Sequence, residues 1–249
     1  TYIWHVNDAR LTLRLSSEAK ARIERAARTS GFSSVSDFIV SSTLRAADEA
    51  ILRSERLVIS ERAMAALLQA HASEPQAQTP DLRAAISKYE EFVFAMGEFV
   101  SLNKGHRRDQ FESGNVELDN YLKHYARQDQ KRGASQTWVL ANPNNPFQIE
   151  TYYTLSAHSV VCEQLRFPYR AIPTILLGRL AVSRRSQGKN YGRIAVVDAL
   201  LRSKKISSEI GLRFVLVQPI NQDVEAFYRK LSFKHLTDSE YWYFDLNQL

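Results

Sequence analysis

A short basic turn in the second half of the chain carries the clearest chemistry. It spans residues 184–192 with the sequence RRSQGKNYG, after an apolar run and before a helical pattern. The first amides of a helix have no intrahelical acceptor, and the helix dipole places positive charge there, so such a turn can bind phosphate. Gly and Asn let the backbone adopt positive φ angles and approach a ligand closely. The turn predicts a phosphate cradle, although this composition is not specific by itself.

The segments around this turn make the prediction specific. Residues 177–182, Gln187 with Gly192 five positions later, and residues 225–233 resemble, in this order, the acetyl-CoA-binding core of GNAT N-acetyltransferases. FESG at 111–114, LD at 118–119, YYTLS at 152–156 and IP at 172–173 resemble, more narrowly, GNAT toxins of the TacT type. The resemblance covers residues 98–246. It implies acetyl transfer from acetyl-CoA to the α-amine of aminoacyl-tRNA, without a metal.

The resemblance also implies roles for individual residues. Tyr228 matches the family's tyrosine, which hydrogen-bonds the CoA sulfur and protonates the departing thiolate. A free tyrosine has a pKa of about 10, so it is protonated at neutral pH, as a general acid must be. Main-chain N–H groups of residues 180–182 would polarise the acetyl carbonyl. The cofactor-binding candidates are Leu180, Ala181, Val182, Gln187, Gly188, Lys189, Asn190, Tyr191, Gly192 and Phe227.

Two residues depart from the family pattern. Asn190 stands where Gly is usual in the cofactor turn, and Ser232 stands where Gly is usual after the tyrosine helix. Asn enters the left-handed region more readily than most residues, so we expect Asn190 to preserve the turn. Its side chain could instead crowd the pyrophosphate and weaken cofactor binding.

The proposed chemistry does not require a dedicated catalytic base. An α-amine has a pKa of about 7.7–8.0 and esterification lowers it, so much of the acceptor is already neutral. We expect His124 and His158 to be structural, and Cys162 to be a buried or idle thiol because no His adjoins it. A single Cys also excludes an internal disulfide framework and a Cys-cluster zinc site.

The positive charge lies in the second part of the chain. Residues 1–95 hold 12 basic and 12 acidic residues, whereas residues 96–249 hold 21 and 15, which is the whole excess of +6. Such a unit suits tRNA, whose phosphates position it without sequence readout, although a solvated surface explains the charge alone equally well. The tRNA-binding candidates are Arg107, Arg108, Arg127, Lys131, Arg132, Arg184 and Arg185, of which the last two could instead meet CoA phosphates.

The N-terminal residues suggest a second function. Residues 10–15 (RLTLRL) alternate strictly, with leucines on one face and Arg10, Thr12 and Arg14 on the other. Helices are expected from 18 to about 29 and from 34–36 to 53. A lone strand leaves its backbone groups unpaired, so we expect a second copy of the chain to pair with it. The resulting ribbon would place Arg10, Thr12 and Arg14 in the DNA major groove.

This order of elements resembles a ribbon-helix-helix antitoxin over residues 8–60. The resemblance implies a homodimer that binds operator DNA through its paired strands. An edge strand of another α+β domain is the alternative.

Residues 54–95 carry a capped amphipathic helix at 60–68, a polar linker near 72–80 and a short helical stretch from 81 to about 89. In the resembled antitoxins, the segment after the DNA-binding fold lies across the toxin and neutralises it. An apolar helix outside the dimer core needs a surface, and the second unit is the nearest one. Met64, Leu67 and Leu68 could instead pack on their own domain.

Strands and helices alternate in the rest of the chain. We expect strands at 137–140, 148–157, 172–182, 213–217 and 241–244, and helices at 118–130, 192–204 and 223–231. Gly178 inside the longest strand suggests a β-bulge. This order implies a mixed sheet covered by helices.

The chain of 249 residues, 44% hydrophobic and 24% charged, is therefore interpreted as α+β. The two resemblances imply a ribbon-helix-helix unit at residues 1–53, a neutralising segment and linker at 54–95, and a GNAT domain at 96–249. With no run of about 18 apolar residues and no signal-peptide pattern, we expect a cytoplasmic protein without a membrane partner. The alternatives are a DNA-binding autorepressor with a weakened, CoA-binding GNAT domain, or an acetyltransferase for a protein or small amine.

Overall fold

The computed structural model describes residues 14–32, 34–54, 56–162 and 171–249. The chain divides into two compact units, residues 1–54 and 55–249, each considered by itself below. Most of the strand expected at 10–15 lies outside the described residues. Arg14 and Leu15 are described and belong to no regular element.

Two helices make up the described part of the first unit. α1 (Ser17–Thr29) begins at Ser16, whose side chain accepts a hydrogen bond from the Ala19 amide. After Gly31, which has φ +74°, α2 (Val35–Ser54) follows. Phe38 of α2 meets Phe32 edge-on, with ring centroids 5.4 Å apart. Both expected helices of this unit are confirmed.

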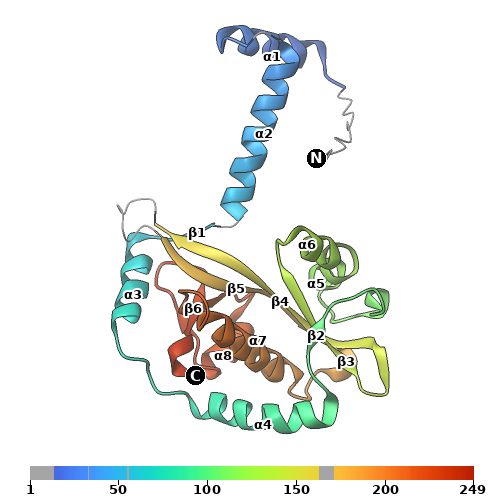
Figure 1. Ribbon diagram of the computed structural model, residues 1–249, viewed down its shortest axis with the longest axis vertical. Coiled ribbons are helices and arrows are strands. Elements are labelled where there is room, and N and C mark those ends of the chain that lie inside the picture. The colour runs from blue at the N-terminus through green and yellow to red at the C-terminus, as the bar shows by residue number, and fades with distance from the viewer. Residues whose placement is uncertain (1–13, 33, 55, 163–170) are drawn as a thin grey trace, which may run out of the picture. The chain divides into compact units, whose positions relative to one another are not determined.

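The second unit is built around a mixed eight-stranded sheet (Figure 1). Its strands are β1 (Arg56–Val58), β2 (Val100–Ser101), β3 (Gln136–Asn142), β4 (Asn145–Val161), β5 (Ala171–Val182), β6 (Phe214–Val217), β7 (Lys234–His235) and β8 (Trp242–Asp245). They lie in the order β2-β3-β4-β5-β6-β8-β7, and β1 pairs with the end of β4. The β5–β6 and β1–β4 pairs are parallel and the others antiparallel.

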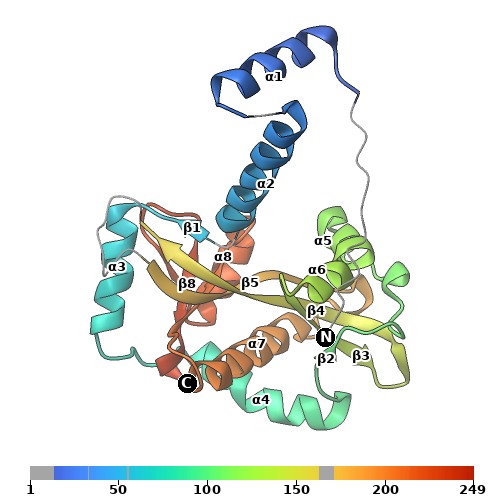
Figure 2. The same ribbon diagram turned by 45° about the horizontal axis from the view of Figure 1, so that its top comes forward.

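Helices cover both faces of this sheet (Figures 1 and 2). α7 (Tyr191–Ser207), α8 (Gln222–Lys230) and α4 (Pro80–Met96) lie on one side, with α4 outside α7. The other face is covered at one end by α5 (Val116–Asn120) and α6 (Ala126–Arg132), joined by a π-helical turn, and at the other end by α3 (Glu61–Ala72). The α+β fold with a helix-covered mixed sheet, expected from the sequence, is confirmed.

Residues 56–96 belong to the core of the second unit. Met64 and Leu67 of α3 are fully buried and pack with Phe214, Leu216 and other apolar residues of the sheet. Leu82 of α4 is likewise buried in the cluster around α7. α4 is also longer than expected, because it continues past residue 89 to Met96. The helices of this segment therefore pack on the sheet and on α7 of the second unit.

Among the described residues, no helix combines the length and apolarity needed to cross a membrane.

Candidate active site

A bulge in β5 shapes the floor of the site. The β4–β5 register shifts between Thr154 and Leu155, where Gly178 is the additional residue, so the predicted bulge is confirmed. A bulge reverses the alternation of side chains beyond it. Leu177 before the bulge and Leu180 and Val182 after it consequently all pack toward the α7 face.

The sheet opens beside this bulge. β5 pairs with β6 only from Thr174 to Leu176. Beyond that point β5 continues to Val182 on β4 alone, so among the described strands its β6 side is open. The predicted residues 180–182 lie on this diverging strand. A thioester placed there would meet main-chain N–H groups, as electrostatic stabilisation of an oxyanion requires.

The phosphate-cradle turn follows directly after β5. A short 3₁₀ turn (Arg184–Ser186) leads to Gly188, with φ +76°, and Asn190, with φ +65°, before α7 starts at Tyr191. Asn190 therefore adopts the left-handed conformation, as expected from its type. Its side chain does not cap α7, which leaves the first amides of that helix without a side-chain acceptor.

A hollow of about 260 Å³ lies at this turn. It is lined by Val182, Ser186, Gln187, Gly188, Asn190, Tyr191, Gly192, Arg193 and Phe227. Seven of the ten predicted cofactor residues are in this set, and Leu180 and Ala181 continue along β5 from Val182. Lys189 instead lines a neighbouring hollow. A Cβ at Gly192 would sit 3.7 Å from both Val182 and Phe227, so the missing side chain helps to keep the hollow open. The residues present fit a pyrophosphate-bearing ligand.

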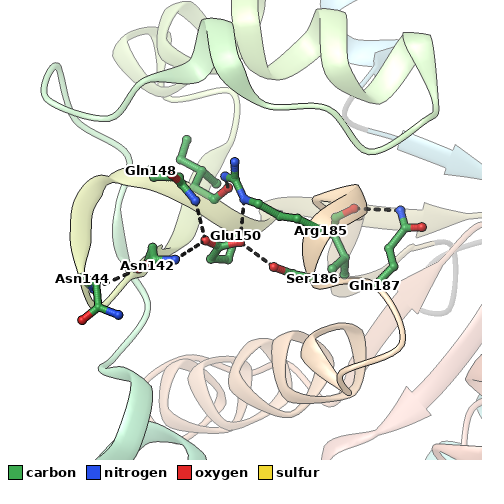
Figure 3. A network of polar contacts seen from close by, with 9 residues as sticks. Asn142, Asn144, Gln148, Glu150, Arg185, Ser186 and Gln187 are labelled. Atoms are coloured by element: carbon green, nitrogen blue, oxygen red, sulfur yellow. Dashed lines mark hydrogen bonds and ion pairs between the residues drawn. The ribbon is translucent and has the colours of Figure 1, made fainter.

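Glu150, which the sequence reasoning did not single out, lies at the centre of a hydrogen-bond network that holds the turn (Figure 3). This carboxylate is 2% exposed and accepts hydrogen bonds from Ser186, Arg185 and Asn142, and also from Gln148. Burial by itself raises the pKa of Glu150, but these four donors outweigh it and hold the pKa below its ordinary value. An acidic residue inside the apolar run 149–155 was the signal available in the sequence.

A second brace comes from residues 111–114. The Gln187 side chain donates to the carbonyls of Ser113 (2.7 Å) and Val182 (3.0 Å). Arg184 pairs with Glu112 at 3.1 Å. The Ser113 hydroxyl and amide both donate to the buried Asp119 carboxylate. The FESG and LD motifs thus fix the outer side of the turn.

Tyr228 lies on α8 next to Phe227, which lines the cradle hollow; Tyr228 itself has 6% of its surface exposed and is not among the lining residues. Its ring meets Phe227 and Phe233 edge-on, at centroid distances of 5.2 and 5.1 Å. Burial raises the pKa of its hydroxyl above the ordinary value, so the group stays protonated at neutral pH. Its hydroxyl has no hydrogen-bond partner among the described residues, which leaves the donor available to a ligand.

Ser232, the second departure from the family pattern, also adopts a positive φ, +66°. Its hydroxyl accepts a hydrogen bond from the Thr79 amide at 2.9 Å. The Thr79 hydroxyl in turn donates to the Lys230 carbonyl at 2.6 Å. Ser232 thus keeps the backbone conformation that Gly would allow and ties the end of α8 to the start of α4.

The seven tRNA-binding candidates divide into two groups by environment. Three have polar partners: Arg108 donates to the Lys123 carbonyl, Arg184 pairs with Glu112, and Arg185 is held by Glu150 and the Ile149 carbonyl. Burial, with a smaller contribution from nearby Arg127, lowers the pKa of Arg108. The side chains in the second group, which form no ion pair among the described residues, are Arg107, Arg127, Lys131 and Arg132.

The remaining candidates are placed as follows. Arg10 and Thr12 lie outside the described residues, whereas Arg14 is exposed just before the α1 cap. Cys162 is buried. In the described ranges, no three His, Cys, Asp or Glu side chains come together in a way that could hold a metal ion.

Comparison with known proteins gives matches to both parts of the chain. The family described as antitoxin TacA 1-like matches residues 10–91. A tRNA-acetylating toxin of Mycobacterium tuberculosis (strain ATCC 25618 / H37Rv) is 32% identical over 129 residues, which cover 50% of this chain and 76% of the relative.

Two solved structures share the fold of the second unit. AtaT complexed with acetyl-methionyl-tRNAfMet matches with a TM-score of 0.54 and 23% identity, over 59% of this chain and 92% of AtaT. A mutant AtaT bound to acetyl-CoA and to the C-terminus of the antitoxin AtaR matches with a TM-score of 0.53 and 23% identity, over 60% and 92%. Because the mycobacterial relative is 32% identical over three quarters of its own length, this chain belongs to the family of tRNA-acetylating toxins, and it carries an antitoxin-like sequence ahead of that domain.

Proposed function

We propose that this chain is an antitoxin–toxin fusion that transfers an acetyl group from acetyl-CoA to the α-amine of aminoacyl-tRNA and thereby blocks translation. One observation carries the proposal. The open cradle at the start of α7 lies beside the diverging end of β5, and the uncommitted Tyr228 hydroxyl is on the adjacent helix. The tRNA-acetylating activity of the mycobacterial relative supports this assignment, and charged tRNA as acceptor implies a cytoplasmic location.

The residues divide the work of the reaction. The amides of the cradle turn and of the first turn of α7 hold the pyrophosphate of acetyl-CoA. When bound, this cosubstrate supplies the thioester whose carbonyl the acceptor amine attacks. Main-chain N–H groups of residues 180–182 stabilise the developing oxyanion, and Tyr228 donates its phenolic proton to the leaving sulfur. The acceptor amine needs no carboxylate base because much of it is neutral near pH 8.

The basic residues on and near α6 bind the acceptor. Arg107, Arg127, Lys131 and Arg132 are available for phosphates because they have no carboxylate partner among the described residues. Arg184 and Arg185 already meet Glu112 and Glu150. We therefore expect these two arginines to position the cradle turn as well as to attract an anion.

Residues 1–53 dimerise as a ribbon-helix-helix unit that binds operator DNA through Arg10, Thr12 and Arg14. The match of residues 10–91 to the TacA 1-like antitoxins supports this role. Residues 54–95 are the antitoxin's neutralising segment, which we expect to restrain transfer only together with residues 1–53, and residues 96–249 are the acetyltransferase.

The restraint of the enzyme leaves the cofactor site accessible. Every residue that lines the cradle hollow comes from 182–193 or is Phe227, and none comes from 56–96. We therefore expect the full chain to bind acetyl-CoA and the restraint to act later, at acceptor access or at transfer.

Radiolabelled acetyl transfer to total charged tRNA tests the proposal. The full chain is compared with residues 55–249, a compact unit that retains the buried contacts of α3 and α4. Label on the aminoacyl-tRNA, with faster transfer by residues 55–249, is expected. Acetyl-CoA binding without transfer by either protein would favour the autorepressor, and label on a protein or small amine would favour a different acceptor.

A further inference from the structure

A second hollow, of about 300 Å³, lies between α4 and the start of α7. Its lining includes the apolar residues Ala84, Ala85, Phe92 and Ile194. Its rim carries three cations, Lys88 from α4 and Lys189 and Arg193 from the turn and first turn of α7, against one carboxylate, Glu91. No role in the reaction described above uses this hollow.

The two hollows adjoin, because they share two lining residues. Asn190 and Arg193 line both the cradle and the second hollow. A ligand held by its pyrophosphate in the cradle can therefore extend into the second hollow without leaving the protein surface.

The chemistry of the second hollow suits a phosphorylated nucleoside. Apolar lining residues that include an aromatic ring accept a purine base, and cations at the rim attract a phosphate dianion. Lys88 and Lys189 are exposed and form no ion pair among the described residues. Arg193, in contrast, forms an ion pair with Asp81, with 3.6 Å between a guanidinium nitrogen and a carboxylate oxygen. Two lysines are thus free to meet an anionic ligand.

α4 is held firmly enough to form a preformed wall. The Tyr89 hydroxyl donates to Asp198 of α7, and Thr79 binds both Ser232 and the Lys230 carbonyl at the end of α8. Leu82 and Ala85 are buried against the α7 cluster. The Phe92 ring meets the ring of Tyr191, a cradle residue, edge-on with the centroids 5.1 Å apart, which holds Phe92 in place in the lining of the second hollow.

We propose that α4, although part of the antitoxin-like sequence, completes the cosubstrate site by binding the 3′-phosphoadenosine end of acetyl-CoA, with Lys88 and Lys189 at the 3′-phosphate. This inference rests on the proposed function, because it takes the cradle as the site of the pyrophosphate. It gives the antitoxin-like segment a positive role in cofactor binding.

Calorimetric titration of the full chain with acetyl-CoA and with acetyl-3′-dephospho-CoA tests this assignment. The parent chain should bind acetyl-CoA about tenfold more tightly, as a charge-assisted contact to one phosphate would give. Lys88→Gln should reduce that preference to about twofold by weakening acetyl-CoA alone, and Lys189→Gln should act in the same direction. Arg83→Gln is the matched control, because Arg83 is an exposed cation of α4 that does not line the hollow.

The outcomes separate this inference from the proposed function. Equal affinity of the parent chain for the two ligands, or a preference that Lys88→Gln leaves unchanged, would overturn the role of α4 while the cradle assignment stands. Failure of the parent chain to bind either ligand would overturn both. Lys88 is exposed, so an unchanged melting temperature should confirm that the variant is folded.

Discussion

The role of Tyr228 leads to a sharp prediction, because Tyr228→Phe removes one oxygen atom and little else. The ring would keep its edge-on contacts with Phe227 and Phe233, at 5.2 and 5.1 Å. The lost hydroxyl has no partner among the described residues, so no buried donor or acceptor is left unsatisfied. We expect the free energy of unfolding to change by about 0.5 kcal/mol or less.

The effect on the chemical step should be far larger. Protonation of a leaving group by a positioned side chain contributes roughly 10²- to 10⁴-fold, or about 3–5 kcal/mol of activation free energy. Acetyl-CoA affinity should stay within about twofold, because the cradle and β5 supply the binding contacts. The expected signature is a loss in kcat of at least about 100-fold with an unchanged Kd.

Single-turnover acetyl transfer to charged tRNA, together with calorimetry for acetyl-CoA, measures both quantities. Tyr241→Phe is the control, because Tyr241 packs at the α3 side of the sheet, away from the cradle. Burial raises the pKa of the Tyr228 hydroxyl, so this group should remain protonated up to at least about pH 10. Its ionisation should therefore not lower the rate of transfer below that pH. Transfer by Tyr228→Phe within a few-fold of the parent rate would refute the general-acid role.

Three further predictions concern the turn, its brace and the DNA-binding strand. Glu150→Gln should lower the free energy of unfolding of the second unit by about 2 kcal/mol in chemical denaturation, because an amide has one acceptor oxygen for the four groups that donate to the carboxylate. The pKa of Glu150 is lowered in the folded protein. The Glu150 carboxylate therefore stabilises the fold above its unfolded pKa of about 4.3, and this stabilisation is lost as the pH falls through the lower folded pKa. Glu150→Gln should lack this part of the loss of stability in acid. Asn190→Gly should keep acetyl-CoA affinity within about twofold, whereas Asn190→Val should weaken it at least about fivefold because φ +65° costs a β-branched residue roughly 1–3 kcal/mol. Arg14→Ala should weaken operator retention in a gel shift without changing the dimer in sedimentation; unchanged retention would count against the ribbon assignment.

Local sequence patterns predict much of this architecture. The apolar runs of residues 137–140, 148–157 and 172–182 predict strands, because a strand buried on both faces needs apolar residues at nearly every position, and the structure places β3, β4 and β5 over these runs. Gly178 predicts the bulge, and the RRSQGKNYG turn predicts the cradle, because positive φ and a helix start are local properties of the backbone.

What the sequence does not predict depends on contacts between distant residues. Glu150 is separated by 35 positions from Arg185, and only the pairing of β4 with β5 brings the two together. α4 extends beyond residue 89 because Tyr89 and Phe92 find Asp198 and Tyr191 on α7, contacts that no helix propensity encodes. The second hollow exists only through the same packing.

The antitoxin-like sequence, residues 10–91, is divided between the two compact units. α1 and α2 lie in the first compact unit, whereas β1, α3 and α4 lie in the second. Lifting α3 from the sheet would expose Met64, Leu67, Phe214 and Leu216, at about 1.5–3 kcal/mol each, which approaches the whole stability of a typical domain. Dissociation of residues 56–96 is therefore not a practical way to relieve restraint. Because α4 also lines the second hollow, we expect control to act through residues 1–54, whose tether keeps them at high local concentration near the enzyme.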